Sequence, residues 1–197
     1  MSSGPALDPH VLAVIIGIFG MLVGASIVTW LLQRRAGGPA WRELAARVKT
    51  WWIMAALFTF ALLVARGASL VFFAFMSFLA LKEFLSLVPT RRADRRVLFW
   101  AYLAIPVQYY WIGTGWYGMF TIFIPVYMFL LLPMRMVTIG ETDGFLKAAG
   151  TLHWGMMTTV YSLSHAAALL TLPAPGTAHA SGAGLMLFLV VLTELND

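Results

Sequence analysis

The sequence predicts an all-α polytopic membrane protein with about six full transmembrane helices, a truncated seventh, an outside N-terminus and a cytoplasmic C-terminus. Of its 197 residues, 61% are hydrophobic and 11% are charged, whereas about a quarter of the residues in a soluble domain are charged. Most basic residues also fall into two clusters that separate long apolar runs. The clusters are Arg34, Arg35, Arg42, Arg47 and Lys49, and Arg91, Arg92, Arg95 and Arg96. A spanning helix needs roughly 20 residues, so the crossings fill a single domain, residues 1–197.

Each expected span is an apolar run that stops at a charge, a glycine turn or a proline. The spans are residues 11–32, 51–65, 68–88, 97–112, 116–132 and 151–172, with 183–197 as the incomplete seventh. The stops are Gln33-Arg34-Arg35, Arg66-Gly67, Pro89, Gly113-Thr114-Gly115, Pro133 and Pro173-Ala174-Pro175-Gly176. We expect residues 41–49 to form an interfacial helix that leads to Trp51 and Trp52 in the aromatic belt. Pro106 is expected to interrupt the fourth span.

The loops between these spans alternate in positive charge. In chain order they carry five, one, four, no, two and no Lys or Arg residues. Cytoplasmic loops are enriched in Lys and Arg, so the odd-numbered loops are predicted to be cytoplasmic. No internal repeat is evident, which disfavours a transporter built from inverted repeats.

Several function classes are excluded or disfavoured by composition. The chain has no cysteine, so disulfides, thiolate nucleophiles and cysteine metal sites are excluded. No Walker loop, Rossmann fingerprint or zinc motif is present. The formal charge of +5 lies mostly beside apolar segments. We therefore expect contact with anionic lipid headgroups and no binding of nucleic acid.

Ionisable residues inside apolar runs are costly and so are candidate functional residues. Lys82 and Glu83 lie near the end of the third span. Lys82 is expected to reach the headgroups, while Glu83 either pairs with another helix or faces a polar cavity. His153 and His165 are twelve residues apart on the sixth span, too far apart to share a metal on a straight helix. A role in hydrogen bonding between helices is favoured for both histidines.

The last residues form the most suggestive polar group. Glu194, Asn196 and Asp197 carry the carboxylate and amide oxygens that suit Mg²⁺. A solvated helix end is the alternative. The final apolar run of about thirteen residues lacks a flanking Lys, Arg or Trp beyond it, so we expect a span that has been cut short. A re-entrant or interfacial helix is the other interpretation.

Four segments resemble the phosphatidate cytidylyltransferase (CDP-diacylglycerol synthase) family. They are Arg47-Val48-Lys49-Thr50-Trp51-Trp52, Leu79-Ala80-Leu81-Lys82-Glu83-Phe84, Leu163-Ser164-His165-Ala166-Ala167 and Thr193-Glu194-Leu195-Asn196-Asp197. In the family, the last segment begins the nucleotide-binding half. The later signatures, a Ser-Pro-x-Lys-Thr segment, a Lys-Arg/Lys-Asp segment and a Pro-Gly-His-Gly-Gly signature, do not occur in these residues. The resemblance therefore implies an N-terminal fragment.

The resemblance implies an enzyme of the bacterial inner membrane that converts CTP and phosphatidic acid to CDP-diacylglycerol and pyrophosphate with Mg²⁺. Asp197 would be the metal or nucleotide residue, with Glu194 and Asn196 beside it and Glu83 and Lys82 as further candidates. The chain would be inactive alone, because the catalytic half would be missing. A homodimer is left open. The rival hypotheses are a non-catalytic membrane scaffold and a small-solute transporter.

Overall fold

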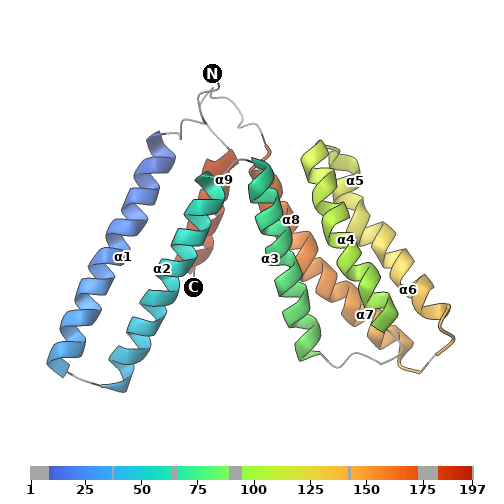
Figure 1. Ribbon diagram of the computed structural model, residues 1–197, viewed down its shortest axis with the longest axis horizontal. Coiled ribbons are helices and arrows are strands. Elements are labelled where there is room, and N and C mark those ends of the chain that lie inside the picture. The colour runs from blue at the N-terminus through green and yellow to red at the C-terminus, as the bar shows by residue number, and fades with distance from the viewer. Residues whose placement is uncertain are drawn as a thin grey trace. The chain divides into compact units, whose positions relative to one another are not determined.

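The computed structural model describes residues 9–36, 38–63, 66–88, 95–141, 143–172 and 182–196. Every regular element in these ranges is a helix, which confirms the all-α prediction. The chain divides into two compact units, residues 1–64 with 174–197 and residues 65–173, and each is described by itself (Figure 1). The single domain expected from the sequence stays a prediction.

Unit 1 is built from two long antiparallel helices and one shorter helix. They are α1 (Pro9–Ala36), α2 (Pro39–Leu63) and α9 (Gly182–Asn196). Val11 and Ile15 of α1 are buried against Leu187 of α9. The expected interfacial helix over residues 41–49 is wrong as a separate element, because it continues into the next apolar run as α2. No glycine or proline separates the two stretches, so nothing breaks the helix between them.

Unit 2 holds four helical runs that alternate in direction. Its elements are α3 (Arg66–Leu87), α4 (Arg95–Thr114), α5 (Tyr117–Ile122), η2 (Phe123–Met128), α6 (Phe129–Val137), α7 (Phe145–Met156), η3 (Met157–Tyr161) and α8 (Ser162–Leu169). The three elements α5, η2 and α6 follow one another without a loop, as do α7, η3 and α8. Helix α3 packs against α4 and against the α7–η3–α8 run. This packing makes the core of unit 2.

Two prolines lie inside helices that the sequence predicts to break or end there. Helix α4 passes through Pro106, and α6 passes through Pro133 and ends at Val137. Both expectations were therefore wrong at these positions. Proline removes one backbone donor, but spanning helices tolerate it when neighbouring groups satisfy the freed carbonyl. Packing in unit 2 thus overrides the local signal.

A third proline shows how such a carbonyl is satisfied. Pro125 has no N–H to bond the carbonyl of Thr121 four residues earlier, and the helix widens into the π-helical segment η2. The hydroxyl of Tyr161, in the second π-helical segment, donates to that Thr121 carbonyl at 3.0 Å. The two irregular segments therefore lie together, joined by a hydrogen bond that links two helical runs.

Three stretches in the described residues are long and apolar enough to cross a bilayer: Val11–Arg35, Gly67–Leu87 and Tyr117–Val137. They coincide with the first, third and fifth expected spans. Only 17% of an 18-residue window in the first stretch is buried within the protein, so most apolar side chains there face outward. Such a surface needs lipid around it, and the protein is an all-α membrane protein. The other expected spans and the predicted orientation stay predictions, with Gly182–Thr193 a shorter apolar helix.

Helix α7 packs closely against Phe84 of α3 at Gly155. A Cβ added there would lie 2.5 Å from Cε1 of Phe84, whereas one added at Gly150 would meet nothing within 4 Å. Both glycines lie within α7, where Ala is favoured over Gly by about 1 kcal/mol. Overpacking a core costs about 1–3 kcal/mol. Gly155→Ala should therefore lower the thermal midpoint of the detergent-solubilised protein, and Gly150→Ala should raise it or leave it unchanged.

Tryptophan fluorescence during heating would measure both midpoints. Replacing Phe84 with Leu in the Gly155→Ala protein should recover part of the loss, because the clash involves the ring. Equal midpoints for the two alanine variants would contradict the close packing.

The absence of cysteine gives a direct test of the predicted orientation. Thr114 and Thr138 are both exposed, and each hydroxyl donates to a carbonyl of its own helix, so the two positions are closely matched. Thr114→Cys should react with a membrane-impermeant maleimide in intact spheroplasts. Thr138→Cys should react only after permeabilisation, because its loop carries the positive charge. The reverse labelling pattern would contradict the predicted orientation.

Candidate functional site

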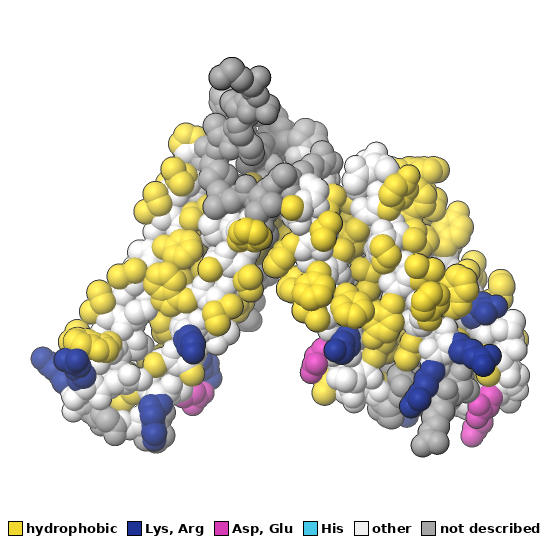
Figure 2. All heavy atoms as spheres, in the orientation of Figure 1, with side chains coloured by type: hydrophobic (Ala, Val, Ile, Leu, Met, Phe, Trp, Pro, Cys, Tyr) yellow, Lys and Arg dark blue, Asp and Glu magenta, His cyan; other side chains and the backbone are white. Residues whose placement is uncertain are grey.

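The described Lys and Arg side chains of unit 2 gather at one end of its helices. They are Lys82 of α3, Arg95 and Arg96 of α4, Arg135 of α6 and Lys147 of α7, and together they form what we call the basic end. Figure 2 shows basic side chains at the lower end of unit 2, below a wide apolar band. The guanidinium of Arg135 lies 5.5 Å from the ring centre of Trp100, which ties α6 to α4 at this end. The basic end is a surface that attracts anions.

Lys82 and Glu83 lie on the outer surface of α3. Both are exposed, whereas Leu81 before them is fully buried and Leu85 after them is buried. Lys82 can reach the headgroup region from this position. The Glu83 side chain points outward from unit 2, and no ion pair of it is seen among the described residues. Its part in a polar cavity stays a prediction.

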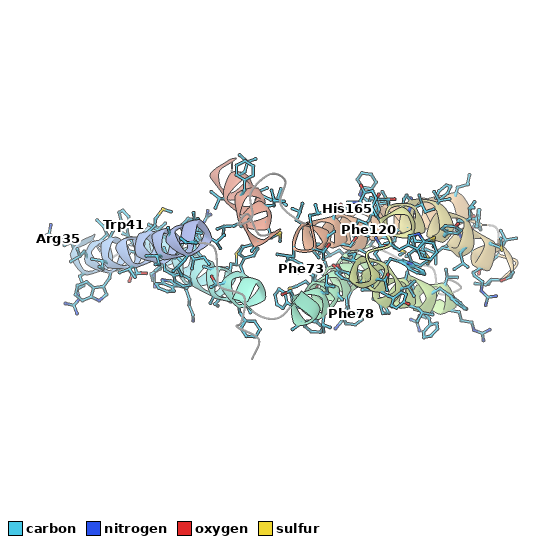
Figure 3. The ribbon with its side chains drawn as sticks, turned by 90° about the horizontal axis from the view of Figure 1, so that it is seen from above. Arg35, Trp41, Phe73, Phe78, Phe120 and His165 are labelled. Carbon is cyan, nitrogen blue, oxygen red and sulfur yellow. The ribbon has the colours of Figure 1, made fainter. Side chains whose placement is uncertain are left out.

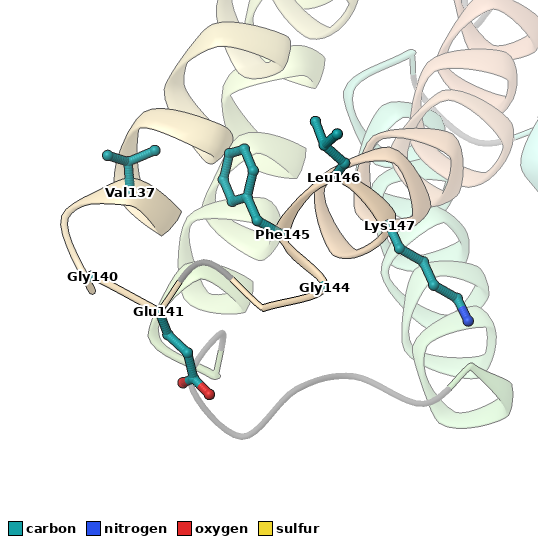
Figure 4. Close-up of a pocket in the computed structure, with 7 residues that line it drawn as sticks. All are labelled: Val137, Gly140, Glu141, Gly144, Phe145, Leu146 and Lys147. Atoms are coloured by element: carbon teal, nitrogen blue, oxygen red, sulfur yellow. The ribbon is translucent and has the colours of Figure 1, made fainter.

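The turn between α6 and α7 encloses a hollow at the basic end. The chain reverses through Gly140 and Gly144, both with positive φ, at +80° and +65°, a conformation that favours glycine. The hollow measures about 370 Å³ and has apolar walls from Val137, Phe145 and Leu146. Glu141 and Lys147 also line it, and in Figure 4 both side chains extend away from the apolar walls. The hollow is therefore amphipathic.

Helix α7 starts at this hollow without a side-chain cap. Gly144 is its N-cap residue, and the first intrahelical bond runs from the N–H of Ala148 to the Gly144 carbonyl at 3.0 Å. The N–H groups of the first turn therefore have no carbonyl partner within the helix. They add partial positive charge beside Lys147.

A buried polar network links α4, α5 and α8 deeper in unit 2. The amide nitrogen of Gln108 donates to the carbonyl of Phe120 at 3.0 Å and to the hydroxyl of Ser164 at 3.1 Å. Ser164 in turn donates to the carbonyl of Tyr161 at 2.7 Å. Gln108 and Ser164 are fully buried. No sequence motif predicts this network, although a lone Gln inside a predicted span is a signal that points to a buried polar contact.

A second buried pair fixes α3 to α4. The hydroxyl of Tyr109 donates to the carbonyl of Phe73 at 3.0 Å. Its oxygen lies 2.9 Å from the hydroxyl of Ser77, and because the Tyr109 proton is already used, Ser77 donates to Tyr109. Both side chains are buried. These bonds position the helices that carry Lys82 and Arg95 to the basic end.

The two histidines lie in separate aromatic surroundings. The ring of His165 lies 4.4 Å from that of Phe120 on α5 (Figure 3), and its Nδ1 lies 2.9 Å from the carbonyl of Tyr161 in its own helical run. The ring of His153 lies 4.8 Å from that of Phe129. The expected hydrogen bond from His165 to another helix is thus wrong, because the adjacent π-helical turn supplies the carbonyl. Its contact across helices is aromatic instead.

The predicted magnesium residues fall at the limit of what the structure describes. Asp197 lies outside the described residues, and the side chains of Glu194 and Asn196, at the end of α9, lie outside them too. Within the described ranges, no three His, Asp or Glu side chains come together as a metal site. The three predicted magnesium residues stay candidates.

The sequence of this chain is similar to those of known proteins. The model of the cytidylyltransferase family matches residues 45–197. This chain belongs to the cytidylyltransferase family. It is also 39% identical over 184 residues to the uncharacterized protein YnbB of Escherichia coli (strain K12), a match that covers 91% of this chain. The chain spans 58% of the length of that relative. No solved structure gives a significant match.

The family match includes all of unit 2 and begins within α2. The basic end, the turn hollow and the buried polar network therefore all belong to the cytidylyltransferase region. Helix α1 precedes it. The resemblance seen in the sequence is thus confirmed at the level of the family.

Tyr109 and its neighbour Tyr110 give a matched test of the buried pair. Tyr109→Phe removes one donor and leaves the Phe73 carbonyl and Ser77 without their partner, at a cost of about 1 kcal/mol. Tyr110 is 61% exposed, so Tyr110→Phe should have little effect. Thermal unfolding in detergent would measure both. Equal stability of the two variants would contradict a structural role for the Tyr109 hydroxyl.

Proposed function

We propose that the whole protein is a multi-pass nucleotidyltransferase of the bacterial inner membrane, acting in phospholipid biosynthesis. It would convert CTP and phosphatidic acid to CDP-diacylglycerol and pyrophosphate. The single observation that carries the proposal is the cytidylyltransferase family match over residues 45–197. The basic end of unit 2 supports it, because both substrates are anionic and are attracted to clustered Lys and Arg.

The proposed reaction is a phosphoryl-type substitution. An oxygen of the lipid phosphate attacks the α-phosphorus of CTP, and the bond from that phosphorus to the oxygen bridging it to the β-phosphate breaks. Pyrophosphate leaves with the electron pair of that bond. Catalysis of this kind depends mainly on positioning and on charge stabilisation. Lys82, Arg95, Arg96, Arg135 and Lys147 supply positive charge at the end of the helices where a headgroup and a soluble nucleotide can meet.

The turn hollow suits the approach of a lipid headgroup. Its apolar walls from Phe145 and Leu146 match the upper part of an acyl chain, and Lys147 with the start of α7 lies beside them. A phosphate at this position would accept hydrogen bonds from N–H groups of the first turn. We therefore assign the lipid substrate to this side of unit 2.

The proposed nucleotide and Mg²⁺ ligands come from the last five residues, Thr193-Glu194-Leu195-Asn196-Asp197. Asp197 is the proposed nucleotide and metal residue, with Glu194 and Asn196 beside it and Glu83 as a further polar candidate. Mg²⁺ bound by such carboxylates would offset the charge of the triphosphate. The remaining length, 42% of the relative, is proposed to carry further catalytic residues, since this chain spans 58% of it. We therefore expect the 197 residues alone to be inactive.

The variant Asp197→Asn tests the assignment of Asp197 as a nucleotide and metal residue. It is made in a longer version of the protein that covers the full length of the relative. CTP-dependent formation of CDP-diacylglycerol from phosphatidic acid in membranes should fall by about a hundredfold or more, because a charge in the reaction site is lost. Membrane insertion should be unchanged. Glu43→Gln is the control, since Glu43 forms an exposed ion pair with Arg47 that contributes little.

Turnover equal to that of the parent would rule out Asp197 as a reaction-site residue. Activity of the 197 residues without extension would show that the essential catalytic residues are already present in them. An extended protein with neither activity nor nucleotide binding would reject the proposed reaction.

A further inference from the structure

Unit 1 contains a groove between α1 and α2, near the end where the two helices connect. The groove has a volume of about 320 Å³. Its α1 side is formed by Ser26, Thr29, Trp30 and Gln33, residues spaced three, one and three apart, and so on one face of the helix. Those residues precede the family match at residue 45. The α1 side of the groove therefore lies before the family match, and its α2 side lies within it.

The opposite side comes from one face of α2. Ala45, Val48, Lys49 and Trp52 line it with the same spacing. Val48 and Thr29 are each only 5% exposed and form the floor where the helices meet. The floor thus combines a methyl surface with a hydroxyl group.

Two hydrogen bonds hold the groove at its two ends. At one end, the indole N–H of Trp52 donates to the hydroxyl of Ser26 at 2.9 Å. At the other end, the amide nitrogen of Gln33 donates to the carbonyl of Trp41 at 3.1 Å. Both bonds run between helices, so they fix the separation of α1 and α2. The groove is therefore a formed feature of the hairpin.

The rim of the groove is cationic. Lys49 is exposed there, and the guanidinium of Arg34 lies 3.7 Å from the ring centre of Trp30. The one carboxylate between residues 33 and 50, that of Glu43, lies 2.9 Å from Arg47 and is thus engaged. Residues 33–50 contain five basic residues and one acidic residue, a net charge of +4. The rim is complementary to an anion.

Three tryptophans surround the groove. Trp30, Trp41 and Trp52 are the amphipathic residues typical of the boundary between headgroups and acyl chains. On α1, exposed apolar residues continue from this level along the helix, among them Ile27 and Val28, each more than half exposed. A ligand with a phosphate at Lys49 would have its apolar part beside these residues.

From these observations we propose that the groove is a binding site for one acidic glycerophospholipid. Lys49 and Arg34 contact its phosphate, the floor at Thr29 contacts the glycerol region, and the acyl chains lie along the exposed face of α1. The lipid held there is not turned over. The bound lipid would stabilise the α1–α2 hairpin in the bilayer.

Native mass spectrometry of the detergent-solubilised 197-residue chain with added phosphatidylglycerol tests the proposal. One tightly retained phosphatidylglycerol is expected, with much less retention of phosphatidylcholine and no displacement by free glycerol phosphate. Lys49→Gln should weaken apparent affinity about fivefold, the effect of one basic residue at an anionic surface. Arg35→Gln is the control. It removes the same charge from a residue that does not line the groove, so it should have little effect.

A second pair of variants tests the groove itself without changing charge. Ala45 lines the groove and Ala46 is exposed beside it. Ala45→Leu should fill the groove and abolish retention of the lipid, whereas Ala46→Leu should keep it. Equal loss or equal retention in the two leucine variants would overturn the proposal, as would equal binding of phosphatidylcholine. Circular dichroism would confirm that each variant is folded.

This measurement does not depend on the proposed reaction, because phosphatidylglycerol is not its substrate and no turnover is measured. Retained lipid together with a failed activity assay would reject only the reaction. Activity together with no retained lipid would reject only the groove.

Discussion

The interaction on which unit 2 depends is the satisfaction of backbone carbonyls that irregular helical turns leave free. In hydrocarbon each unpaired peptide group costs several kcal/mol, so it must find a partner inside the protein. Tyr161 meets this need twice. Its hydroxyl reaches the Thr121 carbonyl released by Pro125, and its own carbonyl accepts from Ser164 and lies beside His165. Around this residue the two π-helical segments and the Gln108 network hold three helices together.

The same constraint separates the polar groups of unit 2 by depth. Inside the helices, the hydroxyls of Ser77 and Tyr109 pair with each other, and the amide nitrogen of Gln108 donates to Phe120 and Ser164. The Lys and Arg side chains that the structure describes in unit 2 lie at the basic end, where headgroups and water can solvate them. The buried network holds α3 and α4 beneath this end, where the proposed lipid and nucleotide substrates would approach. In this way the packing of the core positions the proposed reaction surface.

Unit 1 applies the same physics to a simpler element. A pair of helices in lipid gains little from apolar contact alone, because lipid tails are as apolar as leucine. Trp52 with Ser26 and Gln33 with Trp41 supply the specific contacts instead. These bonds leave a groove of fixed width with a cationic rim. A bound acidic lipid would complete the hairpin and explain why the basic cluster of α1 and α2 carries so few carboxylates.

The sequence by itself determined the all-helical class, the family and the three apolar stretches long enough to span, because hydropathy and segment motifs are local properties. It could not place Pro106 and Pro133 inside helices, since the groups that tolerate them come from neighbouring runs. Nor could it identify the partners of Gln108, because one polar residue in an apolar run carries no sign of the groups that it bonds. The contact of Gly155 with Phe84 was decided by tertiary structure alone, through the close approach of two helices distant in sequence.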